Sequence, residues 1–221
     1  SFDSFRGHRR GRRMILIGQY DSPFVRRVAI ALRLYGFDYE HRPWSVFGDA
    51  GRLGAVNPLR RVPTLILDDG VALVDSVTIL DWLDHEAGPA RALFPAGGTA
   101  RRDALLIAAL ACGLGDKAVS LFYEMRLHDV ASDVWMARCR AQIEGTLALL
   151  ESEYAAGGAP FLRGEAPGHA DIAVACVLRF VSEAHPGAVD PAAIPSLSAL
   201  AARCEAMPVF REIVHPFNPP A

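Results

Sequence analysis

The 221-residue sequence has few cysteines and no long uninterrupted apolar stretch. Its four cysteines lie far apart without a CxxC pair, which argues against a disulfide framework or a zinc site and favours a reducing, cytoplasmic setting. The seven histidines form no HxH or HxxxH pair, so no metal site is expected. Charged residues or glycines interrupt every apolar run before the ~18 residues of a membrane span, so no membrane association is expected.

The sequence also lacks an excess of charge of either sign. Its 23 Lys and Arg nearly balance 25 Asp and Glu, giving a net charge of −2, and this argues against a dedicated nucleic-acid binder. The exception is the N-terminus, where residues 1–13 contain five arginines and no apolar periodicity. Such an arm can tag a protein for RNA, membranes or targeting, but its short length and lack of interleaved aromatics favour a disordered leader outside the fold.

Residues 14–87 alternate between strand and helix signals. An apolar run from Met14 precedes a helix that begins at Pro23 and stops at Gly36, because proline favours a first turn and glycine favours a helix end. The expected elements then continue as a strand over 37–44, a loose helix over 45–57, a hairpin turning at 68–70 and a helix over 76–86. This order predicts a small α/β layer.

The second half of the chain is helical in character. Gly- and Pro-rich residues 88–98 predict a linker, and residues 99–221 predict an all-helical domain. Apolar residues recur with the helical period over 101–127, 133–154, 171–184 and 197–206, and the last six residues are too rich in proline to be helical.

Three short motifs in the α/β layer carry candidate chemistry. Val62-Pro63 opens a strand, where a proline can be an ordinary trans residue or a cis residue that turns the Val62 backbone outward to pair a peptide. Ser22 precedes Pro23 and is either a helix cap or a donor to a bound thiolate. Asp75-Ser76 is either a cap or a corner that binds an amine and a carboxylate.

Together these motifs resemble a known family. Ser22-Pro23-Phe24, the segment from Asn57-Pro58 to Val62-Pro63-Thr64-Leu65, the helix from Asp75-Ser76 and the tetrapeptide Ala170-Asp171-Ile172-Ala173 are similar to those of cytosolic glutathione transferases. The chain resembles a Ser-type member, with S-P-F where omega-type members have C-P-F. The resemblance spans residues 14 to about 215 and implies a thioredoxin-like N-terminal domain with a cis Val-Pro bond, an all-helical C-terminal domain and a homodimer.

The resemblance also implies roles for individual residues. Ser22 would stabilise the glutathione thiolate as the catalytic residue, and Tyr20 is the competing hydroxyl. Val62 would bind the cysteinyl backbone, and Asp75 and Ser76 the γ-glutamyl end. Arg61 either binds the glycyl carboxylate or is a surface arginine. The polar stripe with Lys117, Ser120 and Tyr123 either lines a second-substrate pocket or faces solvent or a partner.

Three positions depart from the family pattern. Serine at position 22 cannot form a mixed disulfide, which argues against thiol-transfer chemistry. Arg60 replaces the usual glycine, and Gly168 replaces the usual Ser or Thr cap, at a cost of a few tenths of a kcal/mol.

The leading hypothesis is therefore an enzyme that uses glutathione as co-substrate, without any other cofactor, against a small hydrophobic electrophile or a hydroperoxide. One alternative is a non-catalytic glutathione-binding or scaffold protein of the same fold, because a serine at position 22 also serves as a cap. Another is isomerase chemistry of the zeta type, whose S-S-C motif is absent here.

Overall fold

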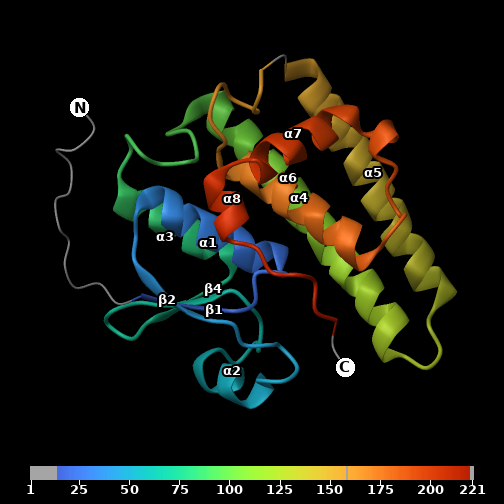
Figure 1. The fold of residues 1–221 in the computed structure, drawn as a ribbon, viewed down its shortest axis with the longest axis horizontal. Helices are drawn as coiled ribbons and strands as arrows, with labels where there is room; N and C mark the ends of the chain where they lie inside the picture. Colours follow the sequence, from blue (N-terminus) through green and yellow to red (C-terminus); the bar gives the residue numbers. More distant parts are fainter. Residues whose placement is uncertain (1–13, 158, 220–221) are drawn as a thin grey trace.

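The computed structural model describes residues 14–157 and 159–219, so the predicted leader over residues 1–13 lies outside the described residues. A four-stranded sheet in the order β2-β1-β3-β4 forms the first part of the fold, with β1 parallel to β2 and the other neighbours antiparallel. Figure 1 shows α1 and α3 on one side of the sheet and α2 on the other. These elements are β1 (Met14–Ile17), α1 (Pro23–Tyr35), β2 (Tyr39–Arg42), α2 (Ala50–Val56), β3 (Thr64–Ile66), β4 (Ala72–Val74) and α3 (Ser76–Ala87).

The rest of the chain is helical and packs beside α1 (Figure 1). The expected α/β layer followed by a helical domain is thus observed, with every predicted helix present. The structure adds two elements that the sequence did not predict, a 3-10 helix and α8. The elements of this part are α4 (Gly98–Leu127), α5 (Asp133–Gly157), α6 (His169–Ala184), η1 (Pro191–Ala193), α7 (Pro195–Glu205) and α8 (Pro208–Glu212).

Helix α4 is the longest element of the fold. Among the described residues it is the one helix long and apolar enough to cross a membrane by length and composition. The sequence analysis counted uninterrupted apolar runs and so did not anticipate this. The helix packs along both α5 and α6, and its buried positions recur on one face, which accounts for the apolar residues on that face.

Helix α1 has clear local start and stop signals. Ser22 is its N-cap, Pro23 occupies the first turn and Gly36 ends the helix in the left-handed conformation with φ of 69°. Most of its side chains are buried, because it packs on α3 at one side and on α6 at the other. It is therefore the element that both halves of the molecule share.

Asp84 on α3 joins the linker to both halves. Its carboxylate accepts hydrogen bonds from the backbone N–H groups of Leu93 (2.9 Å) and Phe94 (3.1 Å) and from the Tyr35 hydroxyl of α1. The Nε2 atom of His169, at the start of α6, lies 3.0 Å from the same carboxylate. The predicted linker is thus held by a buried acceptor, which satisfies its backbone donors.

Asp171, in a tetrapeptide that carries the family resemblance, fixes the entry of α6. Its carboxylate accepts hydrogen bonds from Gly168 N (2.9 Å), Leu162 N (2.9 Å) and the Tyr154 hydroxyl (3.0 Å). Gly168 makes no side-chain cap bond, so the Asp171 carboxylate supplies the side-chain contact at this helix end.

The burial of His169 beside Asp84 predicts a loss of stability in acid. Burial lowers the pKa of His169, so the unfolded chain binds more protons below the ordinary histidine pKa of about 6.5. Burial alone would raise the pKa of Asp84, but the hydrogen bonds from His169, Tyr35 and Leu93 outweigh it and lower that pKa, which adds a loss at still lower pH. We expect urea unfolding to show a free energy that falls between about pH 7 and about pH 5, by at most about 1.4 kcal/mol per pH unit for the His169 proton.

The matched variant is His169→Gln, which keeps an amide near Asp84 but does not titrate. Its free energy of unfolding should depend less on pH over this window than that of the parent protein. Equal slopes for the two proteins would rule out His169 as the titrating group.

Candidate active site

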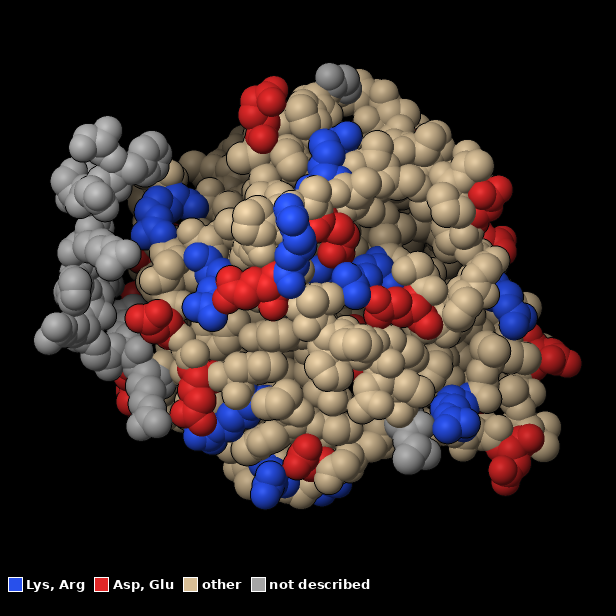
Figure 2. All heavy atoms as spheres, in the orientation of Figure 1, with Lys and Arg blue, Asp and Glu red and all other residues tan. Residues whose placement is uncertain are grey.

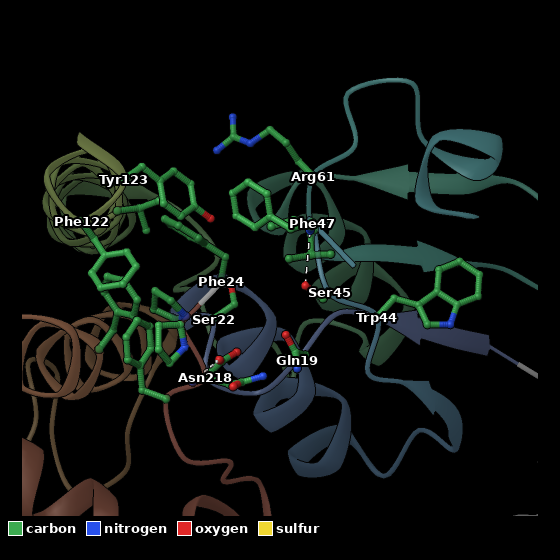
Figure 3. A pocket seen from close by; sticks show the side chains of 18 of the residues that line it. Gln19, Ser22, Phe24, Trp44, Ser45, Phe47, Arg61, Phe122, Tyr123 and Asn218 are labelled. Atoms are coloured by element: carbon green, nitrogen blue, oxygen red, sulfur yellow. Dashed lines mark hydrogen bonds between the residues drawn. The ribbon is translucent and has the colours of Figure 1, made fainter. Parts of the chain in front are cut away.

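A cavity of about 730 Å³ lies where the sheet domain meets α4 and the C-terminal segment. Figure 3 shows Ser22 at its floor, with Phe47 and Tyr123 on opposite sides of its opening. Two contacts cross the cleft between the halves. The Phe47 and Tyr123 rings meet edge to face with centroids 5.3 Å apart, and Arg61 Nη2 lies 3.3 Å from Asp116 Oδ1.

Ser22 is both a helix cap and a free hydroxyl donor. Its Oγ accepts a long hydrogen bond of 3.4 Å from Val25 N, which uses an oxygen lone pair. In the part of the chain that the structure describes, no acceptor takes the hydroxyl hydrogen, and Ser22 lines the cavity at the N-terminus of α1, where the helix dipole favours negative charge. The two roles that the sequence left open for this residue are therefore compatible.

Val62 presents an unpaired stretch of backbone to the cavity. The Val62–Pro63 bond is cis, and the β3 ladder begins only at Thr64. Among the described residues neither the N–H nor the C=O of Val62 has a hydrogen-bond partner. A chain in extended conformation can pair with both groups in the manner of an added strand.

Two neighbours determine where Val62 lies. Gly18, with φ of 128°, follows β1, and a Cβ atom there would lie 2.8 Å from Val62 Cβ. Only glycine permits this approach. Asn57, which is buried, donates from Nδ2 to Arg61 O (2.9 Å) and to Thr64 Oγ1 (3.0 Å), and so holds the turn that leads into Val62.

Asp75 and Ser76 lie beside Val62 but outside the residues that line the cavity. The β3–β4 register pairs Thr64 with Val74, and its continuation places Ser76 opposite Val62. Asp75 Oδ1 caps α3 by accepting from Val77 N (2.9 Å) and Thr78 N (3.3 Å). The predicted cap is thus confirmed, while Asp75 Oδ2 and the Ser76 N–H have no partner in the described part of the chain.

Arg60 and Arg61 bring positive charge to the cavity edge. Both residues line the cavity, and Arg61 is exposed apart from its ion pair with Asp116. Arg60 has φ of 50°, the only positive φ of a non-glycine residue among those described. The backbone conformation explains why glycine is usual at this position and why arginine is strained there.

The α4 side of the cavity contains Tyr123 but not two other residues of the predicted stripe. Successive helical residues turn by about 100°, and Tyr123 shares an arc with Asp116, Val119 and Phe122. Lys117 lies outside this arc and faces α5, with its Nζ atom 5.6 Å from the Trp135 ring centroid, and Ser120 lies just beyond the edge of the arc. The predicted stripe was too wide, because its residues span more than one face of the helix.

Tyr20 also lies away from the cavity. Its hydroxyl is 2.8 Å from that of Tyr39, and its ring stacks on His41 with centroids 3.9 Å apart. Burial and the bond to Tyr39 raise the pKa of Tyr20 far above its ordinary value. Tyr20 therefore packs against β2, and of the two competing residues only Ser22 lines the cavity.

Several cavity residues were missed by the sequence analysis or left undecided. Trp44 and Phe47 follow β2, and both line the cavity. The C-terminal segment was expected to be an extended tail, and nothing in its pattern indicated that it returns to Ser22. The cavity residues without a predicted role include Gln19, Asp21, Ser45, Val46, Gly48, Val119, Phe122, Phe180, Phe217, Asn218 and Pro219.

The four cysteines do not form a reactive centre. Burial raises the pKa values of Cys176 and Cys204 to about 12 and that of Cys112 in the same direction. A thiol with a raised pKa forms little thiolate at neutral pH and is therefore a poor nucleophile. Within residues 14–157 and 159–219, no group of His, Cys, Asp or Glu side chains is arranged to hold a metal ion.

Comparisons with known proteins identify the family. The model for the glutathione S-transferase N-terminal domain matches residues 16–91, and that for the C-terminal domain matches residues 133–206. A glutathione S-transferase from Methylobacterium radiotolerans, solved with glutathione sulfonate, is 31% identical with a TM-score of 0.87, over 95% of this chain and 98% of that one. A Pseudomonas fluorescens family member with bound glutathione is 29% identical with a TM-score of 0.79, over 92% and 100%.

A curated relative, maleylacetoacetate isomerase from Pseudomonas aeruginosa, is 29% identical over 94% of this chain and 98% of its own. The protein belongs to the glutathione S-transferase family, with a thioredoxin-like domain followed by a helical domain.

The strain at Arg60 predicts that Arg60→Gly stabilises the protein. The left-handed conformation costs about 1 kcal/mol for a residue with a side chain, and glycine adopts it freely. The gain is reduced because glycine also makes the unfolded chain more flexible, so we expect an increase of about 0.5 kcal/mol in the free energy of unfolding. The matched control, Arg60→Ala, removes the charge but keeps the strain. Equal stability of the two variants would contradict a backbone origin.

Proposed function

We propose that the protein is a glutathione transferase in which Ser22 stabilises the glutathione thiolate. The observation that carries the proposal is the placement of the unpaired Val62 backbone beside the Ser22 hydroxyl in one cavity. A cysteinyl residue paired in extended form with Val62 offers its N–H and C=O to that backbone and its sulfur to the floor of the cavity. The glutathione-bound relatives support this ligand.

The charges around Val62 suit the two ends of glutathione. At the sheet edge, Asp75 Oδ2 is available to the γ-glutamyl amine, and the Ser76 N–H at the start of α3 is available to its carboxylate. Arg61 directly precedes Val62 in the chain, lines the cavity and is the candidate partner of the glycyl carboxylate. Binding there competes with the exposed ion pair to Asp116, which is worth little because both groups are largely solvated.

Lowering the pKa of the glutathione thiol requires only a small free energy from the protein. Lowering a thiol pKa from about 9 to about 7 requires about 2.7 kcal/mol. A hydrogen bond to a charged group contributes about 1.5–3 kcal/mol, and the α1 N-terminus adds a smaller amount. Once formed, the thiolate attacks a hydrophobic electrophile or reduces a hydroperoxide against the apolar walls provided by Phe24, Val119 and Phe122.

The cellular setting belongs to the same proposal. We infer a cytoplasmic homodimer, on the pattern of the family. Because one relative is an isomerase, glutathione-dependent isomerisation is a further assay for this protein. The S-S-C motif of the zeta type is absent at this position, where Ser22 is followed by proline.

The test is the Ser22→Ala variant, with Ser22→Thr as the control that keeps a hydroxyl and a cap. In Ser22→Ala we expect kcat/KM for conjugation of 1-chloro-2,4-dinitrobenzene to fall about tenfold to hundredfold, because one charge-assisted hydrogen bond is lost. The pH profile should move upward by about one to two units, while the Kd for glutathione changes little. Ser22→Thr should retain most of the activity.

Other outcomes separate the alternatives. Glutathione binding without turnover of chloronitrobenzene, cumene hydroperoxide or an isomerase substrate in the parent protein would favour the scaffold hypothesis. Absence of glutathione binding in calorimetric titration would overturn the assignment of Val62, Asp75 and Ser76.

A further inference from the structure

The C-terminal segment, residues 214–219, returns to the N-terminus of α1. After α8 it runs without regular structure toward the sheet domain (Figure 1). Phe217, Asn218 and Pro219 line the same cavity as Ser22, and Figure 3 places Asn218 close to Ser22. Phe217 is half-buried while its neighbours on both sides are exposed, so this side chain is the part of the segment that packs inward.

Both ends of the segment are attached to the start of α1. At the near end, Arg26 donates from Nε to Ile213 O (2.8 Å) and from Nη2 to Phe210 O (3.0 Å). At the far end, the backbone N–H of Asn218 donates to Asp21 Oδ2 at 3.0 Å. A hydrogen bond to a carboxylate is stronger than one between neutral groups, and we call this second, solvent-exposed attachment the latch.

The segment is also stiff for its length. Pro216 and Pro219 have restricted φ angles, and Asn218 is restricted because it precedes a proline. Between the two attachments, the Phe217 ring meets Phe122 and Phe180 edge to face, with centroids 5.1 Å and 5.6 Å apart. The ring is therefore held between α4 and α6 as part of an aromatic wall.

The latch connects the aromatic wall to the proposed thiolate site at Ser22, because Asp21 directly precedes Ser22 in the chain. We propose that Phe217 is a specificity-determining residue that limits the length of the group carried on the glutathione sulfur, and that the Asp21–Asn218 main-chain hydrogen bond holds it in place. The groups that such a pocket would select on the glutathione sulfur are compact apolar and aromatic substituents. The inference rests on the proposed function and adds the boundary of its second-substrate pocket.

Binding of S-substituted glutathiones tests the boundary without requiring turnover. The ligands are S-methylglutathione, S-benzylglutathione and S-(4-phenylbenzyl)glutathione, titrated calorimetrically into the full chain. In Phe217→Ala we expect the S-benzyl ligand to lose affinity and the S-(4-phenylbenzyl) ligand to gain it. The ratio of their Kd values should shift about tenfold or more toward the longer ligand, the scale at which a pocket discriminates by size. The Kd for S-methylglutathione should change less than twofold.

The latch has its own pair of variants. Asn218→Pro removes the N–H donor and fits the extended backbone before Pro219. Asn218→Ala changes the side chain but keeps the N–H. We expect Asn218→Pro to shift the ratio in the same direction as Phe217→Ala, and Asn218→Ala to keep the parent ratio.

The outcomes distinguish this inference from the function on which it rests. If the parent protein fails to bind S-methylglutathione, the proposed function fails and the boundary with it. If the parent binds all three ligands and Phe217→Ala leaves the ratio of Kd values unchanged, only the role of Phe217 as the pocket boundary is overturned. If the two Asn218 variants give equal ratios, the role of the Asp21–Asn218 hydrogen bond is overturned. Phe217→Leu, expected to give an intermediate ratio, decides the question if the alanine variant does not fold.

Discussion

The ion pair between Arg26 and Glu205 joins the two halves of the molecule, and the cleft depends on that junction. The guanidinium is buried in α1 and binds both carboxylate oxygens of Glu205 on α7, at 2.5 and 2.8 Å. Arg179 on α6 adds a further bond of 3.3 Å to the same carboxylate. Removing one partner of such a pair leaves an uncompensated charge, which costs more than the pair contributes. The same arginine also binds the carbonyls from which the C-terminal segment starts, so its geometry extends to the wall of the cavity.

The candidate site combines the Ser22 hydroxyl with main-chain groups of Val62 and Ser76 that have no partner among the described residues, all at the ends of elements. Val62 precedes the ladder of β3, Ser76 begins α3 and Ser22 precedes α1. The core packing of the sheet and helices therefore determines the positions of these groups, and few side chains need to be specific. Gly18 is a clear case, because any side chain there would displace Val62. The charged face in Figure 2 fits this view, since Lys and Arg lie among Asp and Glu without a continuous patch of either sign. On this face the surface charges therefore provide no field of a single sign.

The parts of the site that the sequence predicted are those governed by local rules. Ser22, Asp75 and Asp171 lie at helix starts, where short side-chain acceptors satisfy free N–H groups, and each is found in that role. The stripe on α4 was predicted less well. A helical stripe does not reveal which arc faces the cleft, and only the packing against α5 and α6 shows that Tyr123 faces it while Lys117 does not.

The sequence alone determined the order of elements, their caps and the α/β-then-helical architecture, because proline, glycine and apolar periodicity act within a few residues. It also located Val62, through the proline that follows. Tertiary structure alone decided the rest: that Tyr20 packs on His41, that Arg60 takes a positive φ and that the end of the chain closes the cavity at Asp21. The last contact joins residues 197 positions apart. Such a contact has no local signal, because it exists only after α1, α6 and α8 have packed together.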